Sequence, residues 1–414
     1  MRRYISRRQR SRIEAKVFLG CIMLYILSFT FIEQLDGNRL VDRGLLILLV
    51  LVEVRGTFLL YLTYNEYDCP YINQVKGLVK ALVTFSFLAS AYALLALVYG
   101  NVDIVMSNLP TILCVGLSLP ASLYYLRNTK LGNTAKLLFW FFGVIYLYSF
   151  LSDILQFSGE NGFSNNVFLY GHNIGYSFVI LTPLALFAYK DNKWIGVILV
   201  ILLTLLVILS AKRGAILVQG IAVLLFTFKG PYSFGRKNTA LMAIVVFFAL
   251  FLILTSMLEL EVSPFSRFNQ TGGSGRDVIY ANIYNGILDS SYGQLIYGHG
   301  FYATMDFNRM LSSNHIAQQA HNDWLEVTYD FGLIGLIGYL LVFVGLCKVT
   351  THSDKPFSRL LMILIAIFII KSFISMVFAD KGSLIYYTTI GLIILENIKE
   401  IRDDPSTLQK SKKR

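Results

Sequence analysis

Long apolar stretches recur along the whole chain and alternate with short polar segments. A helix that crosses the hydrocarbon core of a bilayer needs about 20 mostly apolar residues. Twelve stretches approach that length, so the pattern predicts an all-α integral membrane protein with about twelve transmembrane helices. The predicted spans are residues 17–34, 44–63, 77–99, 104–125, 134–152, 174–189, 194–210, 214–228, 239–257, 325–347, 359–379 and 383–397. The seventh and eighth come from one apolar run that Lys212-Arg213-Gly214 interrupts, which we interpret as a tight reversal between two spans.

One polar segment is much longer than the others and occupies residues 258–324. Long loops with a sequence character of their own tend to be functional. Within it, Ile279, Ile283 and Ile287 recur every four residues, as the apolar positions of an amphipathic helix do. The segment therefore predicts one large outer loop that contains short helices lying on the membrane surface.

Composition supports a membrane protein and excludes several other classes. Apolar residues make up 55% of the 414 residues and charged residues only 15%, well below the fraction typical of soluble domains. These values exclude a disordered protein, a coiled coil and an ordinary cytosolic enzyme. The formal charge is +11, but apolar stretches separate the basic residues, so no continuous basic surface can form. We expect a lipid bilayer as partner and no nucleic acid.

The distribution of Lys and Arg predicts the orientation in the membrane. With a cytoplasmic N-terminus and twelve spans, the predicted inner segments hold 25 Lys and Arg residues and the predicted outer segments hold 8. This bias agrees with the positive-inside rule. It predicts a cytoplasmic basic N-terminus at 1–16 that leads into a retained signal anchor, helices 1–9 within 17–257, the outer loop at 258–324, helices 10–12 within 325–397 and a cytoplasmic tail at 398–414.

Two basic sites are predicted at the outer surface. Lys212 and Arg213 lie where a span meets the outer interface, and Arg276 precedes the predicted surface helix. The guanidinium group matches the geometry of phosphate oxygens, and the first amides of a helix at Gly214 would also point toward an anion. The alternatives are a basic turn that reaches lipid headgroups and a solvated Arg276 paired with Asp277.

Two polar sites lie at the same predicted surface. His321-Asn322 precedes the tenth span, and a neutral histidine can accept a proton at physiological pH. His172-Asn173 precedes the sixth span and could bind sugar hydroxyls. The alternatives are an interfacial polar residue at His321 and an ordinary helix cap at Asn173. No acidic cluster or cysteine pair has the spacing of a metal site, so we expect neither a metal nor another cofactor.

The basic and polar residues together suit one chemistry. Arginines can hold a diphosphate and stabilise the charge that develops as it leaves, while a histidine takes a proton from an attacking hydroxyl. The arrangement predicts group transfer without a metal ion, with the arginines in the place of the metal.

Four stretches carry a resemblance to a known family: GHNIGYSFVILTPLAL, SAKRGAILVQ, SGRDVIYANIYNGILDSSYGQLIYGHGF and HNDWLEVTYDFGLIG. In order and spacing they resemble the bacterial O-antigen ligase and polymerase superfamily. The resemblance implies an integral membrane glycosyltransferase that inverts the anomeric centre and acts on undecaprenyl-diphosphate-linked oligosaccharides. It implies that Arg213 and Arg276 bind the lipid diphosphate and that His321 activates the acceptor hydroxyl. Ile279-Tyr280 departs from the family, whose members often show an aliphatic residue and then Trp.

The leading hypothesis is a polymerase of polysaccharide repeat units in the bacterial inner (plasma) membrane, with its active site on the outer face. A chain-length regulator and a flippase are the expected partners. The near alternative is an O-antigen ligase that moves the finished chain onto lipid A-core. A distant alternative is a twelve-helix secondary transporter, since Glu53, Arg55, Lys80 and Lys371 lie within predicted spans.

Overall fold

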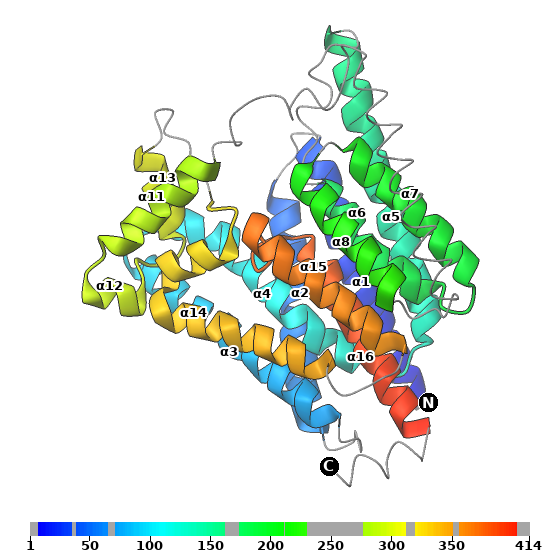
Figure 1. The fold of residues 1–414 in the computed structure, drawn as a ribbon. Coiled ribbons are helices and arrows are strands. Elements are labelled where there is room, and N and C mark those ends of the chain that lie inside the picture. Colours follow the sequence, from blue (N-terminus) through cyan, green and yellow to red (C-terminus); the bar gives the residue numbers. More distant parts are fainter. Residues whose placement is uncertain are drawn as a thin grey trace. The chain divides into compact units, whose positions relative to one another are not determined.

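The regular structure of the chain is helical wherever it is described. The computed structural model describes residues 7–34, 39–64, 71–161, 174–210, 212–229, 276–311, 319–350 and 356–403. These ranges contain helices and no strand (Figure 1), as the apolar pattern predicts. The helices are α1 (Arg7–Gln34), α2 (Arg39–Thr63), α3 (Ile72–Val98), α4 (Val102–Tyr125), α5 (Leu131–Asn161), α6 (Ile174–Ala188), α7 (Lys193–Leu209), α8 (Arg213–Lys229), α11 (Arg276–Leu288), α12 (Tyr292–Tyr297), α13 (Ala303–Leu311), α14 (Asp323–Thr350), α15 (Pro356–Ile374) and α16 (Ser383–Asp403).

Seven of the described helices are long and apolar enough to cross a membrane. They are α1 to α5, α14 and α15. The predicted spans six to eight coincide with the shorter apolar helices α6, α7 and α8. The predicted span at 239–257 lies outside the described residues, and the one at 383–397 lies within α16, which carries charges in its last two turns. A multi-pass membrane protein is therefore supported, and the number twelve stays a prediction.

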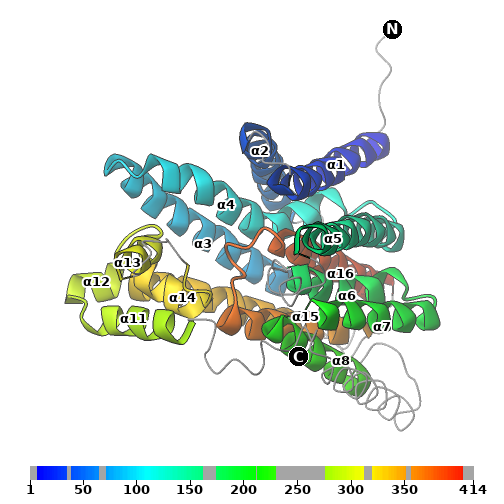
Figure 2. The ribbon, with the colours of Figure 1, turned by 90° about the horizontal axis from the view of Figure 1, so that it is seen from above.

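The described chain divides into two compact units. Unit 1 comprises residues 1–129, 273–352 and 368–414, and unit 2 comprises residues 130–272 and 353–367. In unit 1, α4 packs against α2, α3 and α16, and α3 packs along α14. Both views show α11, α12 and α13 gathered where α14 begins (Figures 1 and 2). A helix is present where the surface helix is predicted, as α11, and two further short helices follow it; its position on the membrane surface stays a prediction.

A kink in α14 fixes the short helices of unit 1 in place. Gly332 interrupts the helix with φ 63°, a left-handed conformation that glycine adopts without steric cost. The carbonyls of Tyr329 and Asp330 accept hydrogen bonds of 2.9 Å from the backbone N–H groups of His299 and Gly300. A Cβ atom at Gly332 would collide with the backbone nitrogen of Gly298, so no larger residue fits this crossing.

In unit 2, polar side chains are paired between apolar helices. Gln219 on α8 accepts a hydrogen bond of 3.2 Å from Thr182 on α6 and donates one of 2.8 Å to Thr204 on α7. Buried amides need such partners because unpaired polar groups are costly. The tight reversal predicted between residues 210 and 214 is confirmed, since α7 ends at Leu209 and α8 begins at Arg213.

Two charges that suggested a transporter have structural partners within unit 1. Arg55 on α2 donates a 2.8 Å hydrogen bond to the Glu14 carboxylate on α1 and a 3.1 Å bond to the Tyr125 hydroxyl on α4. Lys371 near the end of α15 pairs with Asp380. These contacts join neighbouring segments of the bundle, which gives both cations a structural role.

Candidate active site at the beginning of α14

One tyrosine of unit 1, Tyr280, is near Arg276 and contacts His321. Arg276 is the first residue of α11, and its Nη1 donates a 2.6 Å hydrogen bond to the carbonyl of Ile374, the last residue of α15. One turn later on the same face of α11, the Tyr280 hydroxyl donates a 3.1 Å bond to the carbonyl of His321. Burial raises the pKa of Tyr280, and the nearby Arg276 partly opposes that effect. A protonated Tyr280 thus links Arg276 to the His321 backbone.

The end of α15 supplies acceptors for this site. The last carbonyls of a helix lack partners within the helix and attract cations. Arg276 satisfies the carbonyl of Ile374, and the Asn322 amide nitrogen donates a 3.1 Å bond to the carbonyl of Phe373. A guanidinium group has five N–H donors, so one bond to a carbonyl leaves donors for an anion.

Asn322 also begins α14. Its side-chain oxygen accepts hydrogen bonds from the backbone N–H groups of Trp324, at 3.0 Å, and Leu325, at 3.2 Å. This is the geometry of a helix N-cap, which satisfies two otherwise unpaired amides. The same side chain therefore joins the beginning of α14 to the end of α15.

His321 has an uncommon backbone conformation. Its φ is 53°, in the left-handed region that few residues other than glycine adopt. Such conformations persist only when the surroundings hold them, and they concentrate at functional sites. Here the Tyr280 hydroxyl holds the His321 carbonyl, and the Asn322 cap fixes the next residue. The half-buried His321 thus belongs to a rigid turn directly before α14.

The site includes three carboxylates that the sequence reasoning did not single out. Asp323, Glu326 and Asp330 share one face of α14 and are fully buried. Asp323 accepts a 2.6 Å hydrogen bond from the Tyr339 hydroxyl and accepts others from the backbone N–H of Val377. The sequence did hold a signal for this series, because the three acids stand at positions i, i+3 and i+7 of an apolar helix. Burying an acid there costs free energy, so such residues usually have a role.

The other two carboxylates bind the segments that precede His321 and form α13. Glu326 accepts a 2.8 Å bond from the backbone N–H of Ala320, directly before His321. Asp330 accepts two bonds from Thr304 on α13, at 2.8 Å from the backbone N–H and 2.7 Å from the hydroxyl. In the described part of the chain, the second oxygen of each carboxylate is buried without a hydrogen-bond partner.

Tyr302 is a further buried polar residue close to the three carboxylates. It is 1% exposed and has φ 58°. Burial raises the pKa of Tyr302 well above its ordinary value, and the carboxylates Glu326, Asp330 and Asp323 raise it further. Its hydroxyl therefore stays neutral. Among the described residues, no group of three or more His, Cys, Asp or Glu side chains is arranged to hold a metal ion.

The other predicted residues belong to unit 2. Arg213 begins α8, and only its backbone is described. Lys212 precedes it, and a Cβ atom at Gly175, near the start of α6, would lie 3.2 Å from the Lys212 Cβ. The beginnings of α6 and α8 are thus neighbours. His172 and Asn173 lie outside the described residues.

The structure therefore brings together Arg276, His321 and Asn322 within unit 1, and places Lys212 and the first turn of α8 beside α6 within unit 2. These segments all lie within or next to one matched stretch of the sequence. Residues 198–340 match the family model described as O-antigen ligase. The match supports the O-antigen ligase and polymerase superfamily for this chain.

The family implies a glycosyl-transferring enzyme that acts on a lipid-linked oligosaccharide in a membrane. The matched O-antigen ligase segment contains the reversal before α8, helix α11 and the turn at His321. A search of curated proteins finds no match.

Proposed function

We propose that the protein is a membrane glycosyltransferase that polymerises undecaprenyl-diphosphate-linked repeat units into a cell-surface polysaccharide. One observation carries the proposal: Arg276 and His321 are fixed around Tyr280, within the O-antigen ligase segment. Transfer from a diphosphate donor requires an anion-binding group and a proton acceptor in fixed positions, which Arg276 at the start of α11 and His321 before α14 can supply.

In the proposed reaction, His321 takes the proton of the acceptor hydroxyl. The hydroxyl oxygen attacks the anomeric carbon from the face opposite the diphosphate, and the bond from that carbon to the diphosphate oxygen breaks. The leaving diphosphate keeps the bonding electrons, and Arg276 and Arg213 stabilise its charge. The product is an inverted glycosidic bond and undecaprenyl diphosphate. A positioned base supplies about 10²–10⁴-fold in such steps.

The remaining predicted residues have supporting roles in this proposal. Asn322 positions His321 through its cap and its bond to Phe373. Lys212 adds positive charge beside Arg213, and His172 with Asn173 binds sugar hydroxyls. The reaction runs on the outer face of the plasma membrane without a metal ion.

The alternative is an O-antigen ligase that transfers the finished polysaccharide to lipid A-core. The matched family is described as O-antigen ligase, and its superfamily includes both ligases and polymerases. Donor, leaving group and proton acceptor are the same in both reactions. The two functions differ only in the acceptor.

An in vitro reaction tests both functions. Purified full-length protein receives a synthetic undecaprenyl-diphosphate oligosaccharide with a chelator present, and the products are resolved on a gel. A ladder from the donor alone is expected for a metal-independent polymerase. A single shift that needs lipid A-core would establish the ligase instead, and no product in either reaction would overturn the proposed function.

Arginine variants test the anion site within the same reaction. Arg276→Ala is expected to abolish the product, and Arg276→Lys to retain a fraction, since lysine supplies charge without the planar fork. Arg309→Ala is the matched control, because Arg309 is an exposed arginine of the same loop that pairs with Asp306 at 3.4 Å. Equal activity of the Arg276→Ala and Arg309→Ala proteins would remove Arg276 from the site.

A further inference from the structure

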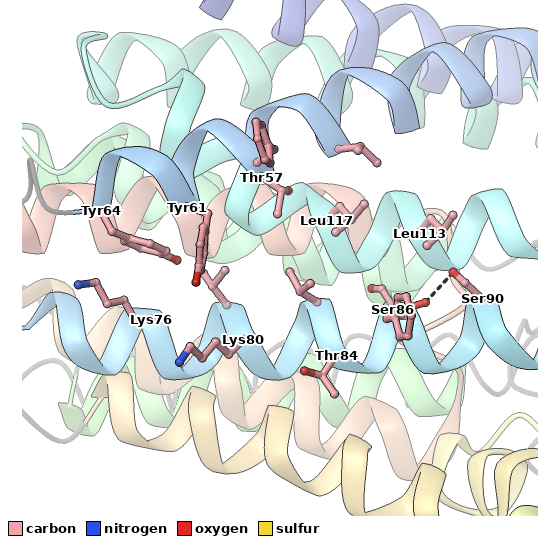
Figure 3. A pocket seen from close by; sticks show the side chains of 15 residues that line it. Thr57, Tyr61, Tyr64, Lys76, Lys80, Thr84, Ser86, Ser90, Leu113 and Leu117 are labelled. Carbon is pink, nitrogen blue, oxygen red and sulfur yellow. Dashed lines mark hydrogen bonds between the residues drawn. The ribbon is translucent and has the colours of Figure 1, made fainter.

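A groove of about 770 Å³ runs between α2, α3 and α4 in unit 1 (Figure 3). Its walls are mostly apolar and include the exposed side chains of Phe58 and Phe87. An apolar groove on the side of a membrane bundle opens toward lipid, so an acyl chain can lie in it. The groove contains none of the residues of the proposed active site.

Two lysines give the groove a charged end. Lys76 and Lys80 lie one turn apart on α3 and line the same end, opposite Tyr61 and Tyr64 (Figure 3). The Lys76 ammonium group lies 5.3 Å from the centre of the Tyr64 ring. Within the described part of the chain, neither lysine makes an ion pair, and no acidic side chain lines the groove. Two like charges one turn apart repel each other, so a bound anion would stabilise the pair.

The charged end lies far from the proposed active site within unit 1. Tyr92, four turns after Lys76 on α3, donates a 2.6 Å hydrogen bond to the carbonyl of Tyr297 in the outer loop. Sixteen residues of helix span about 24 Å, close to the thickness of a hydrocarbon core. At the other end of α3, the Tyr71 hydroxyl bonds to the carbonyl of Val349 at the end of α14. Lys76 therefore lies at the opposite membrane face and Lys80 one turn inside it, on the side that the charge bias predicts to be cytoplasmic.

We propose that this groove binds an anionic phospholipid of the cytoplasmic leaflet. Its phosphate lies between Lys76 and Lys80, and one acyl chain lies along the apolar walls between α2, α3 and α4. Basic pockets between transmembrane helices on the cytoplasmic side are suited to anionic headgroups.

The two parts of the groove together select this ligand. Lysines that only reach the headgroup region would need no hollow beside them. Free phosphate would bind the ammonium groups and leave the apolar walls exposed. A zwitterionic lipid would fill the hollow and bring a cation to the lysines. An anionic phospholipid satisfies both parts at once.

Native mass spectrometry of delipidated full-length protein tests the proposal. Phosphatidylglycerol and phosphatidylethanolamine with identical acyl chains are titrated separately, and inorganic phosphate and undecaprenyl phosphate are added as competitors. Phosphatidylglycerol is expected to bind preferentially. The Lys76→Gln/Lys80→Gln protein should bind it about tenfold more weakly. Lys348→Gln/Lys399→Gln, which removes the same charge from exposed positions outside the groove, should bind as the unaltered protein does.

A second pair of variants separates the hollow from the charge. Val83→Trp fills the groove and keeps both lysines, so it should also weaken phosphatidylglycerol binding. Val98→Trp is its control, since Val98 is exposed near the other end of α3. Thermal melting verifies that each protein folds. Unchanged binding in the groove variants, equal binding of both phospholipids, displacement by inorganic phosphate, or preferential binding of undecaprenyl phosphate would each overturn the proposal.

Discussion

The two ends of unit 1 hold their ionisable side chains in opposite ways. At the beginning of α14, Asp323, Glu326 and Asp330 are fully buried and each accepts hydrogen bonds from a neighbouring segment. At the beginning of α3, Lys76 and Lys80 line an open groove without ion-pair partners among the described residues. The side chains of the first end hold one another in fixed positions. The lysines of the second end are proposed to bind the phosphate of a lipid.

The first end is suited to positioning a proton acceptor, and the second is suited to binding a lipid. A turn that must hold a proton acceptor within a fraction of an ångström needs partners that do not move. A lipid site at a headgroup layer needs long flexible cations that follow a mobile phosphate. Substitutions at the first end should therefore affect the geometry of the reaction, and substitutions at the second should affect lipid binding alone.

The largest effect is expected at His321. His321→Ala removes the proposed base while Tyr280 and Asn322 still hold the turn through backbone groups and the cap. Product formation should fall by about a hundredfold or more, as for the loss of a general base. The measurement is the rate of the in vitro reaction at equal amounts of membrane-inserted protein. A rate equal to that of Arg309→Ala would show that His321 is not the base.

The next effect is expected at Asp330, which holds α13 against α14. Asp330→Ala leaves the backbone N–H and the hydroxyl of Thr304 without their acceptor. Two buried donors without partners should cost about 2–4 kcal/mol of stability. Thr304→Val removes one of the two bonds and should cost less. Thermal melting of both variants and of the double variant measures the coupling, and strictly additive effects would contradict a direct interaction.

A further loss of stability is expected at the kink. Gly332→Ala forces an alanine into φ 63° against the backbone of Gly298. A left-handed non-glycine residue costs about 1–2 kcal/mol before any displacement of the neighbouring backbone. Gly293→Ala on α12 is the control, because nothing lies within 4 Å of the added Cβ atom. If both variants melt at the same temperature, the crossing at Gly332 is not tight.

Periodicity predicted the helices well because the bilayer imposes length and apolarity on each span. It predicted the break before α8 and the helix that begins at Arg276. Position along the chain also placed His321 directly before α14. These features depend on local sequence alone.

The partners of the site residues could not be predicted, because they come from distant segments. Arg276 bonds to Ile374 and Glu326 to Ala320, and no local pattern encodes those contacts. In the sequence, Gly332 is one of several small residues of an apolar stretch, and nothing nearby marks it as the position of a kink. Only the crossing loop at Gly298 shows why that position must be glycine.

The smallest effect is expected at His299, where low pH should loosen the docking of α12. The His299 ring stacks on Tyr329 with a 4.1 Å separation of ring centres, and its Nε2 lies 2.8 Å from the Ser290 hydroxyl. Burial lowers the pKa of His299 below its ordinary value near 6.5. The unfolded segment therefore binds more protons than the folded one as pH falls through that value. The docking of α12 should be fully stable above about pH 6.5 and should weaken below it.

Hydrogen exchange of the backbone amides in α12 at pH 7.5 and 5.5, corrected for intrinsic rates, measures this loosening. His299→Phe keeps an aromatic ring on Tyr329 and cannot titrate, so α12 should keep equal protection at both pH values in that variant. The unaltered protein should lose protection at pH 5.5 because protonation favours fuller contact of the partly buried ring with water. An equal loss in both proteins would trace the pH effect to groups other than His299, and the stacked ring would then be only a packing contact.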